Sequence, residues 1–156
     1  MPVDENAGFT TERILQQAQG NVAAILLGTA AYLQQQGLSP HEWATALGRT
    51  FAPGWEELRG RGARDVAQIA VLNHLSAGAK LISLEGDDHA AEAVVDWPTQ
   101  EMLDFIGFTH PDADVAHDIL RPIAEYLNLQ YEWRREGDHV RVRFTQDTSA
   151  STTSQS

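Results

Sequence analysis

The apolar residues of this chain change their spacing near Lys80, and that change is what most constrains the fold. Before Lys80 they recur every three or four residues, as on one face of a helix. Beyond it, stretches that alternate apolar and polar residues indicate half-buried strands. The chain is predicted to be an α+β protein, with three to four N-terminal helices followed by a β-hairpin, two helices and a second β-hairpin. The antiparallel sheet is expected to pack against the helices, with its strand order left open.

Both predicted hairpins carry a Gly-Asp pair close before a histidine, in "LEGDDHAAEAVV" (84–95) and "REGDHVRVRF" (135–144). Glycine and aspartate suit tight turns, so the likeness is explained by turn chemistry. A two-residue loop at 137–138 sets these partners opposite each other: Glu136 and His139, Trp133 and Val142, Glu132 and Arg143, Tyr131 and Phe144. A loop at 86–87 would likewise pair Ile82 with Ala91 and Leu84 with His89.

Five helices are expected from periodicity and capping signals. The first, over 11–36, has apolar residues and one threonine at 15, 18, 22, 25, 29 and 32, a heptad-like spacing, with small apolar residues on its other faces. It is predicted to be central and closely packed. The others are expected from Pro40, from Ala63, over 99–106 and over 109–127, the last kinked by Pro122.

Length and composition predict one globular domain over residues 1–146. The chain has 156 residues, 42% of them apolar, which suffices for one sizeable core. The final stretch, over 147–156, is polar and has no apolar periodicity, so we expect a disordered tail.

Charge and residue usage exclude several classes of function. Eleven basic against 22 acidic residues give a net charge of −11, which repels phosphate backbones, so no nucleic-acid partner is expected. The chain has no cysteine, which excludes disulfides and thiolate metal sites. Its most apolar run, at 22–33, is shorter than the roughly 20 residues that cross a bilayer. We therefore expect a cytoplasmic protein with no membrane partner.

One row of polar residues has the spacing of a metal site. On a helix beginning at 110, His110, Asp114, His117 and Arg121 would lie on one face. Arg121 would place a positive charge beside the cation, and the row lies opposite the apolar stripe of the same helix. The favoured interpretation is a solvated face with local ion pairs, so no metal site is predicted and any cofactor stays unknown.

Polar and aromatic residues in apolar surroundings are the candidate ligand contacts. Asn73 and His74 occur inside a nearly all-apolar helix, so each is expected to be at least partly buried, where it either bonds its neighbours or faces a ligand. Four tryptophans are more than a core of this size needs. The predicted ligand-binding residues are Tyr32, Trp43, Asn73, His74 and Trp97.

The C-terminal third, "ILRPIAEYLNLQYEWRREGDHVRVRF", and the order of elements resemble the fold shared by transport-particle subunits and 4-vinyl-reductase-type small-molecule-binding domains. The resemblance covers about residues 70–145. It implies a hydrophobic cavity closed between helices and sheet, and a dimer. Many such domains have cysteines around the last hairpin, whereas this chain has none, so a metal or thiol role is not carried over.

Three functions stay open from the sequence. The first is a non-catalytic, dimeric domain that binds a small apolar ligand in a sensory or accessory role. The second is an enzyme with His74 as general base and Asn73 or an arginine stabilising negative charge, which would need a second titratable group near His74. The third is a protein–protein interaction module that uses the first helix or exposed tryptophans.

Overall fold

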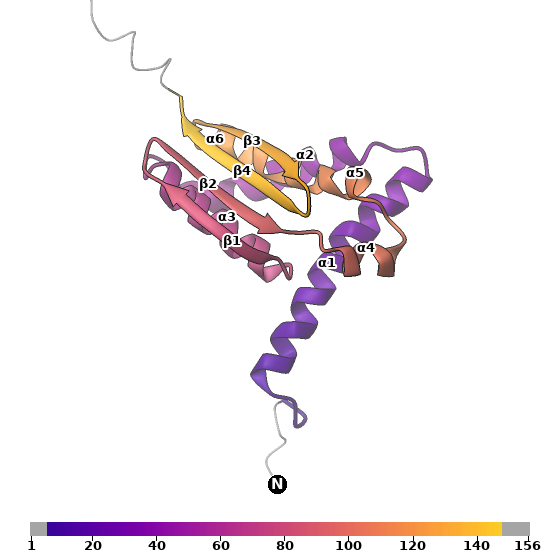
Figure 1. Cartoon of the computed structure of the whole chain (residues 1–156). Helices are drawn as coiled ribbons and strands as arrows, with labels where there is room; N and C mark the ends of the chain where they lie inside the picture. The colour runs from indigo at the N-terminus through magenta and orange to yellow at the C-terminus, as the bar shows by residue number, and fades with distance from the viewer. Residues whose placement is uncertain (1–5, 148–156) are drawn as a thin grey trace, which may run out of the picture.

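The computed structural model describes residues 6–147 and has the α+β architecture expected from the sequence (Figure 1). Four antiparallel strands form one sheet in the order β1-β2-β4-β3, so the two hairpins meet through β2 and β4. The strands are β1 (Lys80–Gly86), β2 (Ala90–Asp96), β3 (Leu129–Glu136) and β4 (His139–Gln146). This arrangement settles the strand order that the sequence left open.

Helical segments precede the sheet and also connect its hairpins. Before β1 come α1 (Thr11–Gln35), α2 (Pro40–Phe51), the 3-10 helix η1 (Ala52–Leu58) and α3 (Ala63–Ser76). Between the hairpins lie α4 (Gln100–Ile106), α5 (His110–Ala113), the 3-10 helix η2 (Asp114–Ile119) and α6 (Leu120–Tyr126). Helix α3 packs on β1, β2 and β4, and α6 packs on β3, so together they cover the inner face of the sheet.

The inner face of the sheet supplies much of the buried core. Val140, Val142 and Phe144 of β4 are fully buried and belong to the same apolar cluster as the inward side chains of α3. The outer face is polar, and Arg141 bridges Glu92 of β2 and Glu136 of β3 there. Alternation of apolar and charged residues along β4 thus separates core from solvent, as the period of a strand requires.

The predicted register of the second hairpin is confirmed. Trp133 pairs with Val142, and Glu136 pairs with His139, across the two-residue loop at 137–138. Gly137 has a positive φ of 63°, which glycine adopts without strain.

The predicted register of the first hairpin is wrong. Leu84 pairs with Ala93 instead of His89, and a bulge at Ile82 shifts the register between Leu81 and Ser83. The loop is longer than expected because the carboxylate of Asp87 accepts hydrogen bonds from the backbone N–H groups of His89 (2.8 Å) and Ala90 (3.1 Å). These hydrogen bonds stabilise a loop that is longer than the two-residue turn expected at 86–87.

Helix α1 is not the central helix that its composition predicted. Its buried residues are Ala23, Leu27 and Ala30, on one narrow face of the C-terminal half. The N-terminal half extends away from the body of the molecule (Figure 1). Small apolar residues around the whole helix predicted contacts on every side, but other elements of the chain pack against only one side of α1. None of the described helices is long and apolar enough to cross a membrane.

The single kinked helix expected over 109–127 is wrong as well. The segment divides into α5, η2 and α6, and a 3-10 stretch lies in its middle. Pro122 does not kink a continuous helix, because it lies in the first turn of α6, where a backbone N–H has no helical acceptor. Residues 148–156 of the expected tail lie outside the described part of the chain.

Helix α2 makes a close contact with the η2–α6 segment at Gly48, and this contact generates a stability prediction. A Cβ at this position would collide with the carbonyl oxygen of Ile119 and the ring of Pro122. We expect Gly48→Ala to lower the free energy of unfolding by about 1–3 kcal/mol, the typical cost of overpacking. Urea unfolding followed by circular dichroism measures this change.

Gly20 of α1 provides the matched control, because nothing lies within 4 Å of a Cβ placed there. Gly20→Ala should leave the protein unchanged or stabilise it by about 0.5–1 kcal/mol, the difference in helix propensity. Equal effects of the two substitutions would contradict the close contact between α2 and the η2–α6 segment.

Candidate functional site

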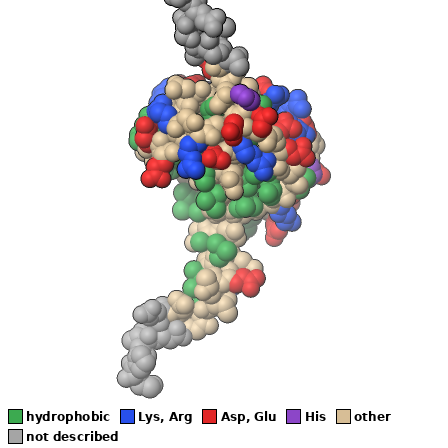
Figure 2. Space-filling model, turned by 90° about the vertical axis from the view of Figure 1, so that its left-hand side faces the viewer, with side chains coloured by type: hydrophobic (Ala, Val, Ile, Leu, Met, Phe, Trp, Pro, Cys, Tyr) green, Lys and Arg blue, Asp and Glu red, His purple; other side chains and the backbone are tan. Residues whose placement is uncertain are grey.

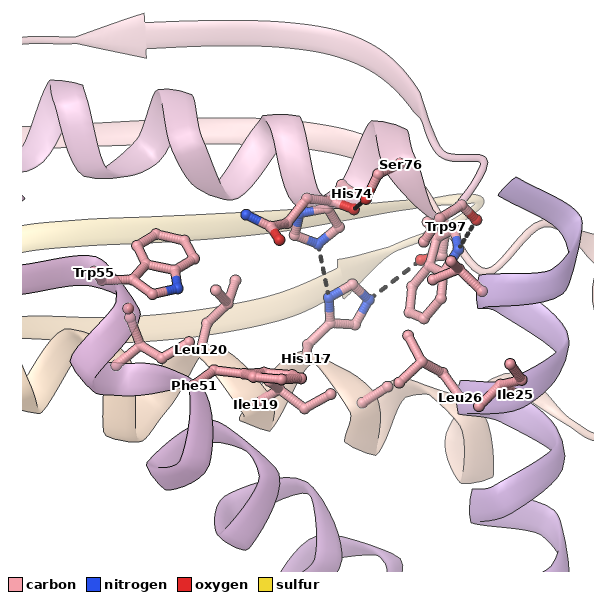
Figure 3. A pocket seen from close by; sticks show the side chains of 16 residues that line it. Ile25, Leu26, Phe51, Trp55, His74, Ser76, Trp97, His117, Ile119 and Leu120 are labelled. Atoms are coloured by element: carbon pink, nitrogen blue, oxygen red, sulfur yellow. Dashed lines mark hydrogen bonds between the residues drawn. The ribbon is translucent and has the colours of Figure 1, made fainter. Parts of the chain in front are cut away.

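An apolar pocket of about 510 Å³ opens between α1, η1, α3 and the η2–α6 segment (Figure 3). Its polar side chains are few and come from α3 and η2: Asn73, His74, Ser76 and His117. The apolar and aromatic wall includes Val22, Ile25, Leu26, Phe51, Trp55, Trp97, Ile119, Leu120 and Ile123. Volume and lining are those of a small-molecule site, in which hydrocarbon surface provides affinity and a few polar groups fix orientation.

Two buried histidines of this pocket lie against each other. His74 comes from α3 and His117 from η2, and their exposed fractions are 9% and 2%. The rings are stacked, with centroids 5.4 Å apart and planes 20° from parallel. Nε2 of His74 lies 3.4 Å from Nδ1 of His117 (Figure 3). The fold therefore brings together two titratable groups that are 43 residues apart in sequence.

Backbone carbonyls determine which ring nitrogens carry hydrogen. Nδ1 of His74 lies 2.8 Å from the carbonyl oxygen of Ala70, and Nε2 of His117 lies 3.2 Å from that of Trp97. Because a carbonyl oxygen only accepts, the tautomers that satisfy both carbonyls carry N–H on these two nitrogens. A neutral imidazole has one N–H, so the two nitrogens that face each other are both bare. The neutral pair thus has two acceptors in contact and no donor between them.

Burial keeps this pair neutral at physiological pH. Loss of solvation lowers the pKa of His74 below its ordinary value of 6.5. For His117, desolvation and then the neighbouring charges of His74 and Arg135 lower the pKa to about 3. With the carbonyl-bonded tautomers, the neutral pair has two acceptor nitrogens near pH 7, to which a hydroxyl or N–H group of a ligand can donate.

Trp97 closes one end of the pocket and holds His117 in place. Its side chain is 3% exposed, and its indole N–H donates to the carbonyl of Ala77 at 2.9 Å. The indole ring meets His117 edge to face, with centroids 5.5 Å apart. On the other side of His117 lies Trp133, also at 5.5 Å. The hydroxyl of Tyr131 donates to the His117 carbonyl at 2.7 Å, which fixes the backbone as well.

Three of the five predicted ligand contacts line the pocket. Asn73, His74 and Trp97 do, although Asn73 is exposed, contrary to its expected burial, and bonds the Ile69 carbonyl at 2.9 Å. Tyr32 and Trp43 are not among the lining residues. Tyr32 is 59% exposed on α1, and Trp43 packs against the core from α2. Tyr32 shares the α1 face of Val22 and Ile25 but lies two turns beyond Ile25, and α2 reaches the pocket through Phe51 at its end instead of through Trp43.

His117 is the site residue that sequence reasoning assigned to a different role. Its spacing from His110 and Asp114 placed it on a solvated helix face, and that interpretation is wrong because Asp114 and His117 are buried. In the 3-10 helix η2 each residue turns by about 120° instead of 100°, so residues three apart, such as Asp114 and His117, still share a face, whereas residues four apart do not. The residue pattern held no signal for this placement, because on an α-helix His117 lies opposite the apolar stripe.

The four residues of the predicted row therefore do not form one site. His110 Nδ1 lies 4.0 Å from Asp114, Asp114 forms a two-pronged ion pair with Arg135, and Arg121 contacts Asp118 at 3.4 Å. His117 points instead at His74. Across residues 6–147, no three His, Asp or Glu side chains converge as metal ligands would.

Asp118 anchors the segment that carries His117. Its carboxylate accepts the indole N–H of Trp133 at 2.8 Å and contacts Nδ1 of His41 at 2.8 Å. Those partners belong to β3 and α2, so η2 is fixed between the sheet and the helix layer. A buried carboxylate requires such partners, and they position His117 with little freedom.

No protein-family model matches this chain, and no curated protein matches it either.

The lowered pKa values of the histidine pair predict a loss of stability in acid. Between pH 6.5 and the lower folded-state pKa, the unfolded chain binds protons that the folded chain does not. Stability is therefore complete above about pH 6.5 and falls as the pH decreases, by up to about 1.4 kcal/mol per pH unit for each histidine.

Urea midpoints measured from pH 7 to pH 5 for the wild type and for His74→Phe test this expectation. Phenylalanine keeps an aromatic ring beside His117 but does not titrate, so the variant should show a shallower decline. Parallel curves for the two proteins would show that His74 does not contribute to the acid sensitivity.

Proposed function

We propose that this chain is a non-catalytic binding domain for a small, largely apolar molecule that carries a hydrogen-bond donor. The observation that carries the proposal is the apolar pocket of about 510 Å³ in which ring nitrogens of two buried histidines lie 3.4 Å apart. Apolar walls favour a hydrocarbon body, and the histidine pair favours a hydroxyl or N–H group at one end.

The size of the pocket supports a ligand of ordinary metabolite size. Ligand sites usually enclose about 300–1,000 Å³, and this one falls inside that range. Trp55 and Trp97 contribute aromatic surface at different parts of the wall (Figure 3), which favours flat or branched hydrocarbon groups. A charged ligand is disfavoured, because no charged side chain is among the lining residues.

An enzyme with His74 as general base needs a second titratable group nearby, and His117 lies beside His74. However, both pKa values are lowered, which makes each imidazole a weak base. We therefore favour binding over catalysis, with the pair as an acceptor for the ligand's donor group.

A pair of isomeric probes tests the proposed donor. 1-Octanol and 1-methoxyheptane have the same atoms, but only the alcohol can donate a hydrogen bond. We expect the alcohol to bind roughly 3- to 10-fold more tightly, the worth of one satisfied hydrogen bond. Titration followed by tryptophan fluorescence measures both affinities, because Trp55 and Trp97 line the pocket.

His74→Phe should abolish this preference and leave binding of the ether nearly unchanged. The substitution should disturb α3 little, because the Ala70 carbonyl that loses its bond to His74 Nδ1 still accepts a backbone N–H within the helix. An equal preference in the variant would show that the donor is recognised elsewhere, and equal affinities in the wild type would refute the donor requirement.

A blocking substitution tests the pocket independently of the histidines. Ser76 is exposed and lines the pocket, so Ser76→Phe should place a ring in the opening and weaken binding of both probes by tenfold or more. Gln68 is exposed on the same helix outside the pocket, and Gln68→Phe should leave both affinities unchanged. Failure of either probe to bind the wild type would count against the binding function itself.

A further inference from the structure

Helix α1 presents an exposed apolar seam that its own fold does not cover. The seam comprises the heptad-spaced positions Leu15, Ala18, Val22, Ile25, Thr29 and Tyr32. Leu15, Ile25 and Tyr32 are 54%, 67% and 59% exposed. The buried residues of α1 lie on another face, so the heptad repeat is not explained by packing within the chain. Alternating steps of three and four along a helix are typical of a seam that meets another helix.

The seam is uncharged in an otherwise acidic protein. Between Arg13 and Glu42 there is no Asp, Glu, Lys or Arg, whereas the whole chain has 22 acidic and 11 basic residues. Two copies of a chain with net charge −11 repel each other over most of their surface. The α1 seam is a long surface that two copies can bring together without placing like charges in contact.

The area of the α1 seam is too small for a stable interface by itself, so the contact must include neighbouring residues. A helix of 25 residues is about 37 Å long, and a stripe about 10 Å wide along it offers roughly 400 Å². A stable interface takes about 800 Å² from each partner, so the seam alone supplies about half. Exposed apolar residues near the seam, Phe51 (49% exposed) and Leu72 (60%), can supply the remaining area.

These additional residues lie around the mouth of the pocket. Phe51 lines it, and Leu72 is one helical turn from Ser76, which also lines it. Val22 and Ile25 line the pocket and also stand at the middle of the seam. Figure 2 shows hydrophobic side chains gathered on the side of the body from which α1 emerges. Seam and pocket mouth are thus one continuous apolar surface.

We propose that a second copy of this chain covers this surface, with the two α1 helices pairing along the heptad seam. Val22 and Ile25 lie at the centre of the seam, so the partner helix passes over the pocket mouth and completes its wall. A heptad seam selects a helix with the same repeat, which a second copy supplies. A lipid surface is a poorer occupant, because helices that lie on membranes usually carry Lys and Arg beside the apolar face, and α1 has none after Arg13.

Sedimentation equilibrium of the full chain, without ligand, tests the proposal. The wild type should give twice the chain mass at micromolar concentration, and Ile25→Glu should weaken association roughly 100-fold, because both copies then bury a carboxylate. Ala24→Glu is the matched control: Ala24 is also exposed and adjacent in sequence but lies off the seam, so its dimer should persist.

Leu15→Glu is a second variant that should not unfold the body, because Leu15 is exposed and lies in the N-terminal half of α1, away from the buried residues Ala23, Leu27 and Ala30. It should also weaken the dimer. A wild-type monomer throughout the concentration range, or equal loss of dimer in Ala24→Glu and Ile25→Glu, would overturn the proposal. So would a monomer that binds phosphatidylcholine vesicles only when Ile25 is intact. Because the measurement uses no ligand, its outcome is separate from that of the proposed binding function.

Discussion

The buried polar side chains of η2 determine how the layers of this molecule fit together. Each has its partners outside η2: Asp114 on β3 through Arg135, His117 at the carbonyl of Trp97, and Asp118 on β3 and α2 through Trp133 and His41. Polar groups removed from water cost several kcal/mol unless they are paired, so these contacts permit few other placements of η2. The position of η2 in turn fixes His117 and one wall of the pocket.

The pocket and the α1 seam form one apolar surface, whereas the outer face of the sheet carries charged side chains. On the outer face of the sheet, Arg141 pairs with Glu92 and Glu136, which leaves that surface well solvated. Around the pocket mouth, by contrast, Val22, Ile25 and Phe51 remain partly uncovered. An apolar surface of this extent costs free energy in water, and both proposed occupants, a ligand inside and a second copy outside, would remove it.

Much of the fold could be predicted because local signals agreed with one another. The alternation over 129–146 and the Gly137-Asp138 loop predicted the second hairpin, and its register is as expected. The first hairpin departed from prediction because the side chain of Asp87 binds two backbone N–H groups, a choice that depends on loop geometry and not on the residue pattern. In the site, His74 and Trp97 were predicted from unusual residues in apolar surroundings, whereas Tyr32 and Trp43 were not brought to the pocket.

The sequence by itself determined most helix and strand segments, the α+β class and the heptad seam of α1. These features depend on residues that lie close together in the chain. Only the tertiary structure decided that the seam stays exposed, that η2 is a 3-10 helix, and that His117 meets His74 across 43 residues. The physical reason is that burial and hydrogen-bond partners are shared between distant segments. A spacing such as that of His110, Asp114 and His117 therefore has no fixed meaning until the packing of η2 selects the face on which each side chain lies.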